Sequence, residues 1–366
     1  MIIWLAELIL ASWALSYGAE HLSAKYGAKF VGRTILSVAT TLPEIAIVIY
    51  AAAAGSYGVA IGAGLGSNLL MMTLGLSLML IIATTRISKS PLKGINVSAF
   101  RLDKIFLLVT AVVSAILFID GYNYLDGFIF AGLFIAYFIM ALLEMRAEKI
   151  KTELKAKKTS SDVDIDRLHE DITIKDLQHT KDDLVNMDQD NHRHDHRSTL
   201  ARDKIKKRTI RSILIFSAGT IGILVGAGPF IHALEGFSVE IGVSAIVLAV
   251  IISPIAGEMP EKISLMILAR KGAVGVSIAI ANVLGSKILN NTLLLSVAVF
   301  GAMYHGGFLT VIETNPVLTF QIILVTVVTI IALLPMFRKE IGLKTGMMLL
   351  SMYVVSIMIQ FFLPHE

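Results

Sequence analysis

Apolar residues in this chain are gathered into runs of about 20, and charged residues lie mostly in the gaps between the runs. A helix of that length crosses about 30 Å of hydrocarbon. Membrane β-strands would instead show about 10 residues of alternating polarity. Segments 107–118 and 322–334 are apolar on every face. The pattern therefore predicts an all-α polytopic membrane protein.

Ten transmembrane helices are expected, as two inverted five-helix repeats. The first five cover 1–22, 30–54, 58–85, 105–120 and 124–145, and the second five cover 213–232, 239–269, 273–304, 316–337 and 345–363. Three of these runs exceed what a straight crossing needs, which predicts tilted or broken helices. The expected domains are a first repeat at 1–145, a charged loop at 146–211 and a second repeat at 212–366.

The distribution of Lys and Arg predicts the orientation, because basic residues in short loops stay cytoplasmic. They follow the first, third, fifth, seventh and ninth predicted helices, and they are missing from the gaps at 55–57, 121–123 and 232–238. This places both termini outside and the loop 146–211 in the cytoplasm, so we expect a multi-pass protein of the cell membrane. Five helices per half make the second half enter the membrane in the opposite orientation.

Composition excludes several classes of protein. The hydrophobic fraction is 55% and the charged fraction 16%, which a soluble globular domain does not show. With no cysteine there is no disulfide and no thiolate metal site. Nearly all Lys and Arg residues lie in the loops that flank the predicted helices, where membrane orientation explains them. We therefore expect no nucleic-acid partner. The tract at His192, His194 and His196 alternates with charged residues and is interpreted as solvated.

A pair of motifs occurs once in each half. Val38-Ala-Thr-Thr-Leu-Pro-Glu44 is followed by Gly66-Ser-Asn-Leu-Leu-Met71, and Ile255-Ala-Gly-Glu-Met-Pro-Glu261 is followed by Gly285-Ser-Lys-Ile-Leu-Asn290 at nearly the same spacing. Transporters built from inverted repeats bring equivalent residues together near the middle of the bilayer. The motifs therefore predict a site where the two halves meet.

Glu44 and Glu261 each lie within an otherwise apolar predicted helix. An ionised carboxylate there costs at least about 2.5 kcal/mol unless it is paired. Two such groups at the midplane can share a cation, and oxygen ligands suit Ca²⁺, Mg²⁺, Mn²⁺ or Na⁺. The alternative is a pair of structural carboxylates buried against Lys or Arg.

Prolines and hydroxyls complete the predicted site. Pro43 and Pro260 remove a helix hydrogen bond, so the carbonyls four residues earlier, at Ala39 and Ala256, are expected to be free as neutral ligands. Hydroxyl oxygens that fill out the shell are expected from Thr40, Thr41, Ser67 and Ser286.

The two halves differ at the site. Thr41 of the first half corresponds to Glu258, Asn68 to Lys287, and Met71 to Asn290. A third carboxylate and an ammonium have thus been gained together. One hypothesis is that Lys287 acts as a tethered cation that neutralises Glu258 or the pair of Glu44 and Glu261. The alternative is that Lys287 snorkels to an interface.

These motifs resemble those of the calcium/cation antiporter superfamily, the sodium/calcium exchangers and their calcium/proton relatives. Ala39-Thr-Thr-Leu-Pro-Glu44 is similar to the Gly-Thr-Ser-Leu-Pro-Glu signature, Gly66-Ser67 to the second element, and 120–127 to the linker before the fifth helix. The second half resembles the family more loosely, at 257–261 and 282–286. The likeness covers both halves and leaves out the long loop.

The resemblance implies an antiporter that works by alternating access. Glu44 and Glu261 would be shared Ca²⁺ and Na⁺ ligands, with backbone carbonyls near Thr40 and Gly257 and flanking sites at Thr41, Ser67, Ser286 and the amide of Asn290. The first and sixth helices would form the sliding gate. Departures at 257–258, Met71 and Lys287 concern sodium coupling and the choice of divalent ion.

The sequence favours a monomeric exchanger without cofactors, whose partners are inorganic cations and the lipid bilayer. A Ca²⁺/H⁺ antiporter and an exchanger of Mg²⁺ or Mn²⁺ remain open. A passive channel would need a continuous pore. An intramembrane protease would need a catalytic set of paired aspartates, or of a Ser with a His, within the predicted helices. No such motif is identified there, so no enzymatic activity is expected.

Overall fold

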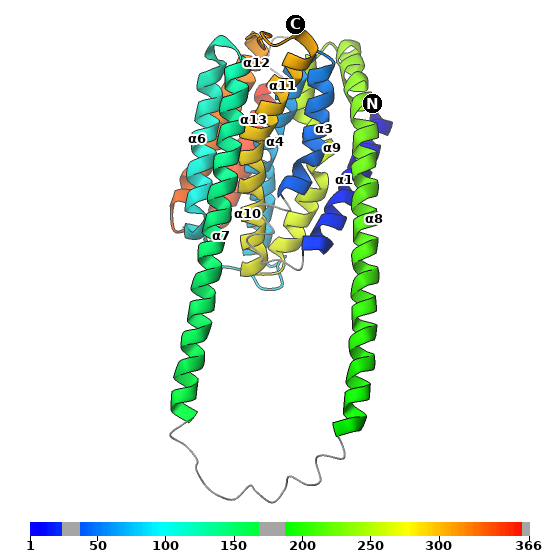
Figure 1. The fold of residues 1–366 in the computed structure, drawn as a ribbon. Helices are drawn as coiled ribbons and strands as arrows, with labels where there is room; N and C mark the ends of the chain where they lie inside the picture. Colours follow the sequence, from blue (N-terminus) through cyan, green and yellow to red (C-terminus); the bar gives the residue numbers. More distant parts are fainter. Residues whose placement is uncertain (24–36, 168–186, 361–366) are drawn as a thin grey trace, which may run out of the picture. The chain divides into compact units, whose positions relative to one another are not determined.

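The computed structural model describes residues 1–23, 37–167 and 187–360. The chain divides into two compact units, one made of Met1–Phe138 with Ile213–Glu366 and the other of Ile139–Ser212. Within the first unit the helices lie side by side as a bundle (Figure 1). The described part of the second unit is helical and belongs to two long helices.

The chain folds almost entirely into helices. In the first half these are α1 (Ile2–Ser23), α3 (Ser37–Ala53), α4 (Tyr57–Leu70), α5 (Leu76–Thr84), α6 (Arg101–Leu117) and α7 (Tyr124–Arg167). In the second half they are α8 (Met187–Ile241), α9 (Ala245–Ala269), α10 (Ala273–Leu289), α11 (Leu295–Gly306), α12 (Pro316–Leu333) and α13 (Leu343–Gln360). Short 3₁₀ turns, η3 (Ser98–Phe100), η4 (Phe118–Asp120) and η6 (Leu334–Phe337), extend α6 and α12.

Seven helical stretches of the described chain are long and apolar enough to cross a membrane: Tyr57–Thr84, Ser98–Asp120, Tyr124–Glu144, Thr209–Ile241, Ala273–Gly306, Pro316–Phe337 and Leu343–Gln360. Three shorter apolar helices cover Ile2–Gly18, Thr41–Ala53 and Ala245–Met259. The predicted all-α class agrees with this architecture.

Two of the long stretches contain a π-helical turn at the same place in each half. The turn η2 (Met71–Gly75) lies between α4 and α5, and η5 (Asn290–Leu294) lies between α10 and α11. Each follows the Gly-Ser motif of its half. Thr73 donates to the Leu69 carbonyl, and Thr292 donates to the Ile288 carbonyl at 2.6 Å. Both hydroxyls satisfy carbonyls next to the widened turn, where the regular helix ladder is interrupted.

Loops from the two halves pair with each other. The strand β1 (Ile95–Asn96), between α5 and α6, is antiparallel to β2 (Glu340–Ile341), between α12 and α13. Tyr122 forms a β-bridge with Ile312, which joins the α6–α7 loop to the α11–α12 loop. Each pairing joins two loops that the positive-inside pattern assigns to the same side of the membrane.

Several predicted boundaries are wrong. Helix α8 continues past His232 to Ile241, and the turn into α9 occurs at Gly242, whose φ is +67°. The helix ends there because the left-handed conformation of Gly242, which favours glycine, cannot continue a right-handed helix. The expected extension of the neighbouring helices into the loop, over 144–158 and 200–211, is confirmed and is longer than expected, because α7 runs to Arg167 and α8 begins at Met187. The side chains of the histidine tract lie outside the described part.

Glycines let α4 approach α9 closely. A Cβ atom at Gly66 would lie 2.0 Å from the carbonyl oxygen of Val250, and one at Gly62 would lie 3.1 Å from that of Ile246. Backbone atoms at such distances cannot give way as a flexible side chain does. The crossing of α4 and α9 therefore requires a residue without a side chain at position 66.

We expect Gly66→Ala to separate α4 from α9 and to lower the free energy of unfolding by about 1–3 kcal/mol or more, the cost of overpacking. Thermal unfolding of the detergent-purified protein measures this loss. The control is Gly132→Ala in α7, where an added Cβ meets nothing within 4 Å. Equal stability of the two variants would contradict the close crossing.

Candidate functional site

Three glutamates meet in the interior of the bundle. Glu44 on α3 and Glu258 and Glu261 on α9 each offer a carboxylate oxygen within 4.8 Å of the other two. Their relative exposures are 2%, 0% and 1%. The predicted approach of Glu44 and Glu261 is thus seen in the structure, and Glu258 joins them.

The local sequence explains how the carboxylates converge. Glu258 and Glu261 are three residues apart on α9, so they share one face of the helix. Gly257 lies beside Glu44, and a Cβ there would be 3.2 Å from the carboxyl carbon of Glu44. The glycine leaves the space that α3 needs to bring its carboxylate against α9.

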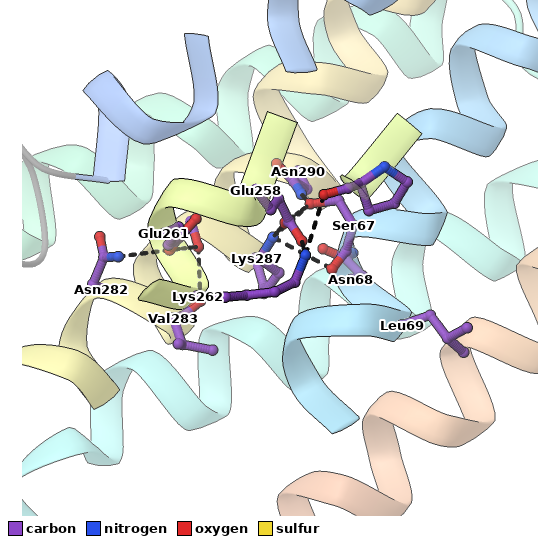
Figure 2. Close-up of polar contacts among 12 residues, drawn as sticks. Ser67, Asn68, Leu69, Glu258, Glu261, Lys262, Asn282, Val283, Lys287 and Asn290 are labelled. Atoms are coloured by element: carbon purple, nitrogen blue, oxygen red, sulfur yellow. Dashed lines mark hydrogen bonds and ion pairs between the residues drawn. The ribbon is translucent and has the colours of Figure 1, made fainter. Parts of the chain in front are cut away.

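Glu261 is held by α10. The Asn282 side-chain amide donates to Glu261 Oε1 at 2.6 Å, and Ser286 Oγ donates to the same oxygen at 3.3 Å (Figure 2). Ser286 Oγ also lies 3.1 Å from the Val283 carbonyl. These contacts fix one oxygen of Glu261 and leave the other for a further ligand.

Glu258 is paired with a lysine. Lys287 Nζ contacts Glu258 Oε1, and it lies 2.6 Å from Ser67 Oγ and 3.4 Å from the Ser67 carbonyl oxygen. Ser67 Oγ also bonds to Glu258 Oε1. Figure 2 shows these side chains converging from α4, α9 and α10. Lys287 is 1% exposed, so the snorkelling alternative does not describe this structure.

Asparagines surround the lysine. The Asn290 amide lies 2.7 Å from Ser67 Oγ, and Asn68 Nδ2 donates to Asn291 Oδ1 at 2.5 Å. The second contact joins η5 to α4 across the two halves. Asn68 thus forms a neutral hydrogen bond between two amides, whereas Lys287, at the corresponding position of the second half, carries a charge.

A second lysine lies on the other side of Glu258. Lys262 Nζ is 3.9 Å from Glu258 Oε2 and donates to the Pro254 carbonyl at 3.2 Å. Within the described residues, one oxygen of each carboxylate, Oε2 of Glu44, Glu258 and Glu261, has no hydrogen-bond partner. Three carboxylates against two ammonium groups leave a negative balance. A hard cation among the three free oxygens would satisfy them.

The prolines do not break their helices as expected. α3 runs through Pro43, and α9 runs through Pro260, without a change of helix type. The expected free carbonyl of Ala256 accepts a hydrogen bond from Ser12 Oγ of α1 at 3.3 Å. The bond that Pro260 removes is replaced in this way by a neighbouring helix. The carbonyl is therefore a contact between α1 and α9.

The remaining predicted residues are placed as follows. Thr41 is buried on α3, three residues before Glu44. Thr40 belongs to α3 and Pro260 to α9, but both side chains lie outside the described part, as does any contact of the Ala39 side chain. Ser67 and Ser286 do not play equivalent parts, because the first contacts Lys287 and the second contacts Glu261.

Four residues at the site were not predicted from the sequence: Ser12, Lys262, Asn282 and Asn291. Asn282 lies four residues before Ser286, which places both on one face of α10. Lys262 lies four residues after Glu258 on α9, the spacing of a helix ion pair. These two had a signal in the sequence. Ser12 and Asn291 had none, because their partners are distant in the chain.

Comparison with known proteins identifies the family of this chain. The sequence pattern of the sodium/calcium exchanger proteins matches residues 1–143 and 211–362. The chain belongs to the sodium/calcium exchanger family. It is therefore a membrane protein of a transporter family, within the calcium/cation antiporter superfamily that its motifs resemble.

The family includes relatives of different length. An uncharacterized membrane protein of Methanocaldococcus jannaschii, MJ0091, is 21% identical over 342 residues, which cover 93% of this chain and 90% of that protein. The sodium/calcium exchanger NCL2 of Oryza sativa subsp. japonica is 29% identical over 158 residues, which cover 43% of this chain and 26% of that protein.

Solved structures share the fold. The sodium-calcium exchanger NCX_Mj matches with a TM-score of 0.59 at 19% identity, over 98% of this chain and 96% of that chain. The H⁺/Ca²⁺ exchanger CAX matches with a TM-score of 0.71 at 18% identity, over 99% of this chain and 81% of that chain. At such identities the likeness concerns the fold.

Asn282→Ala should lower the affinity for a divalent cation roughly tenfold or more, because groups that orient a ligand carboxylate affect metal binding to this extent. Glu261 would keep only the longer Ser286 contact. The measurement is Ca²⁺ titration of the purified protein, and Asn96→Ala, an exposed amide on β1, is the control. Unchanged Ca²⁺ affinity in Asn282→Ala would remove Asn282 from the site.

Glu258→Gln should lower the free energy of unfolding by roughly 3–5 kcal/mol, because it leaves the buried Lys287 ammonium without its counter-charge. Thermal unfolding in detergent measures the loss. The double variant Glu258→Gln with Lys287→Gln should recover most of it. A double variant as unstable as the sum of the two single variants would show that the two residues do not act as a pair.

Proposed function

We propose that this protein is a secondary active antiporter that exchanges a divalent cation, Ca²⁺ in the first place, for Na⁺. The observation that carries the proposal is the group of three buried carboxylates, Glu44, Glu258 and Glu261, each with one oxygen that lacks a hydrogen bond. Buried charges of one sign need compensation. A divalent ion with oxygen ligands is the compensation that this geometry accepts.

Coupling follows from the electrostatics of the empty site. Without a cation, neighbouring carboxylates repel one another in a medium of low dielectric constant, so the empty site resists occlusion. Entry of Ca²⁺ or of monovalent cations relieves the repulsion. The protein would then change its exposure only when loaded, and this condition converts binding into exchange.

The proposed transmembrane arrangement is ten crossings in two inverted five-helix repeats. It is supported by the repeated order of the motifs, by η2 and η5 at corresponding places, and by the two loop pairings. We place the protein in the cell membrane, with both termini outside and 146–211 in the cytoplasm, as the basic loops predict. It would act as a monomer on inorganic cations within the lipid bilayer, with no cofactor and no nucleic-acid partner.

The helices α1 and α8 are proposed as the moving gate. They pack through small residues, since a Cβ at Gly219 would lie 2.5 Å from the Leu15 nitrogen and one at Gly222 would lie 2.9 Å from the Ala11 side chain. Smooth surfaces of this kind allow helices to slide. Ser12 of α1 also donates a hydrogen bond to the Ala256 carbonyl, one residue before Gly257. Movement of α1 would therefore displace the backbone beside the site.

The chain's membership in a family that includes sodium/calcium exchangers supports Na⁺ as the coupling ion. The calcium/proton alternative draws on the likeness to the H⁺/Ca²⁺ exchanger, which concerns the fold. Exchange of Mg²⁺ or Mn²⁺ is the third reading. The Na⁺ and H⁺ alternatives differ in the ion gradient that drives Ca²⁺ uptake. The Mg²⁺ or Mn²⁺ alternative differs in which divalent ions compete with Ca²⁺.

The test is Ca²⁺ uptake into proteoliposomes under an imposed Na⁺ gradient, an imposed H⁺ gradient or none. We expect uptake only with the Na⁺ gradient, saturating with Ca²⁺. Uptake driven by H⁺ alone would replace Na⁺ by H⁺ in the proposal, and inhibition by Mg²⁺ or Mn²⁺ would identify another divalent substrate. Flux that needs no counter-ion would indicate a channel and overturn antiport.

Glu44→Gln and Glu261→Gln should each reduce this uptake to the level of empty liposomes, because either change removes a charged ligand of the shared cation. Glu240→Gln, an exposed residue near the end of α8, is the matched control and should transport normally. Transport that survives either of the first two substitutions would contradict the assignment of the site.

A further inference from the structure

The ammonium of Lys287 is enclosed by oxygen atoms. Ser67 supplies its hydroxyl at 2.6 Å and its carbonyl at 3.4 Å, and Glu258 supplies Oε1. The Asn290 amide faces the same point, and its oxygen lies 3.2 Å from Nζ when the amide is oriented so that its nitrogen donates to the Ser286 carbonyl. With the amide in that orientation, the ammonium has four oxygen neighbours. Figure 2 shows the three residues that supply them, Ser67, Glu258 and Asn290, next to Lys287.

This set of neighbours is a cation-binding set. It combines one carboxylate, one hydroxyl, one backbone carbonyl and one amide oxygen, which are the groups that hard cations take in proteins. They come from both halves, Ser67 from α4, Glu258 from α9 and Asn290 from η5. A charge of +1 already fills the place, and it is covalently attached to α10.

The corresponding position in the first half makes a different contact. Asn68 stands where the second half has Lys287, and its amide bonds to Asn291. The first half therefore has an amide at this point and the second half has a charge. The gain of Lys287 goes with the gain of Glu258 where the first half has Thr41.

Lys262 provides a contrast within the same site. Its Nζ has one carbonyl neighbour, that of Pro254 at 3.2 Å, and lies 3.9 Å from Glu258 Oε2. Two oxygen neighbours on one helix do not form an enclosure. Both lysines bring a positive charge near Glu258, but only Lys287 occupies a place that an ion could take.

We propose that the Lys287 ammonium is a resident substitute for one exchangeable monovalent cation. The inference rests on the proposed antiport. A site that already holds one attached positive charge takes up one fewer Na⁺ for each divalent ion released. Replacing Lys287 by a neutral amide empties the enclosure of Ser67, Glu258 and Asn290, and a free Na⁺ then enters it.

The substitution that tests this is Lys287→Asn, which gives the second half the residue that the first half has at position 68. Lys104→Gln is the control, because it removes a buried ammonium of α6 that lies outside the site and donates to the Val97 and Met336 carbonyls. Both are purified and reconstituted beside the unaltered protein. The first measurement is thermal unfolding in detergent as NaCl replaces choline chloride at constant ionic strength, without Ca²⁺.

Na⁺ should stabilise Lys287→Asn over a concentration range in which it leaves the unaltered protein and Lys104→Gln nearly unchanged, because a ligand of the folded state raises its stability. A gain that is equal in all three proteins overturns the proposal. So does a Lys287→Asn protein that stays unfolded at saturating Na⁺, since Na⁺ is expected to replace the ammonium.

The second measurement is the Ca²⁺ gradient that a roughly tenfold Na⁺ gradient sustains in proteoliposomes at zero membrane potential. One additional Na⁺ per cycle multiplies that equilibrium gradient by about ten in Lys287→Asn, since each tenfold ratio of Na⁺ adds its free energy once more. The gradient in Lys104→Gln should equal that of the unaltered protein. An unchanged gradient in Lys287→Asn overturns the substitution hypothesis.

The two proposals fail differently. If the unaltered protein shows no Na⁺-driven Ca²⁺ uptake, antiport of these ions fails, while the unfolding measurement still reports whether Na⁺ enters the enclosure. If the unaltered protein exchanges the ions and Lys287→Asn shows neither a Na⁺-dependent stabilisation nor a larger Ca²⁺ gradient, antiport stands and the resident cation is rejected.

Discussion

The structure depends on the burial of charge in the middle of a hydrophobic bundle. Glu44, Glu258, Glu261, Lys262 and Lys287 are all 5% exposed or less. Each would be costly alone in a medium of low dielectric constant. The close crossing of α4 and α9, the glycine beside Glu44 and the polar face of α10 all serve to bring opposite charges and hydrogen-bond donors within reach.

The two halves match in the helical elements around the site and differ in the charged residues that these elements carry. The π-turns η2 and η5, with Thr73 and Thr292 in matching roles, place polar residues at one level of the bundle in both halves. At that level Asn68 and Lys287 differ in charge. The two halves thus match in their helices but differ in charge. This difference distinguishes the proposed cation site from a simple pair of carboxylates.

The helices around the site are suited to transport. α1 touches the site only indirectly, through Ser12 and the Ala256 carbonyl, and it meets α8 across small residues. The helices α9 and α10 are linked to each other by the bond from Asn282 to Glu261, and α10 is linked to α4 by the contacts of Lys287 with Ser67. Alternating access by motion of α1 and α8 over this core is consistent with that division.

The sequence by itself determined the helical class, the repeated motifs and the meeting of Glu44 with Glu261, because apolar runs and embedded carboxylates leave few arrangements in lipid. It also pointed to Lys287 as a partner of Glu258. Only the tertiary structure decided which oxygens enclose Lys287, that Asn282 holds Glu261 and that Ser12 engages the Ala256 carbonyl. Those contacts join segments far apart in the chain, and their geometry follows from how the helices pack, which local periodicity does not encode.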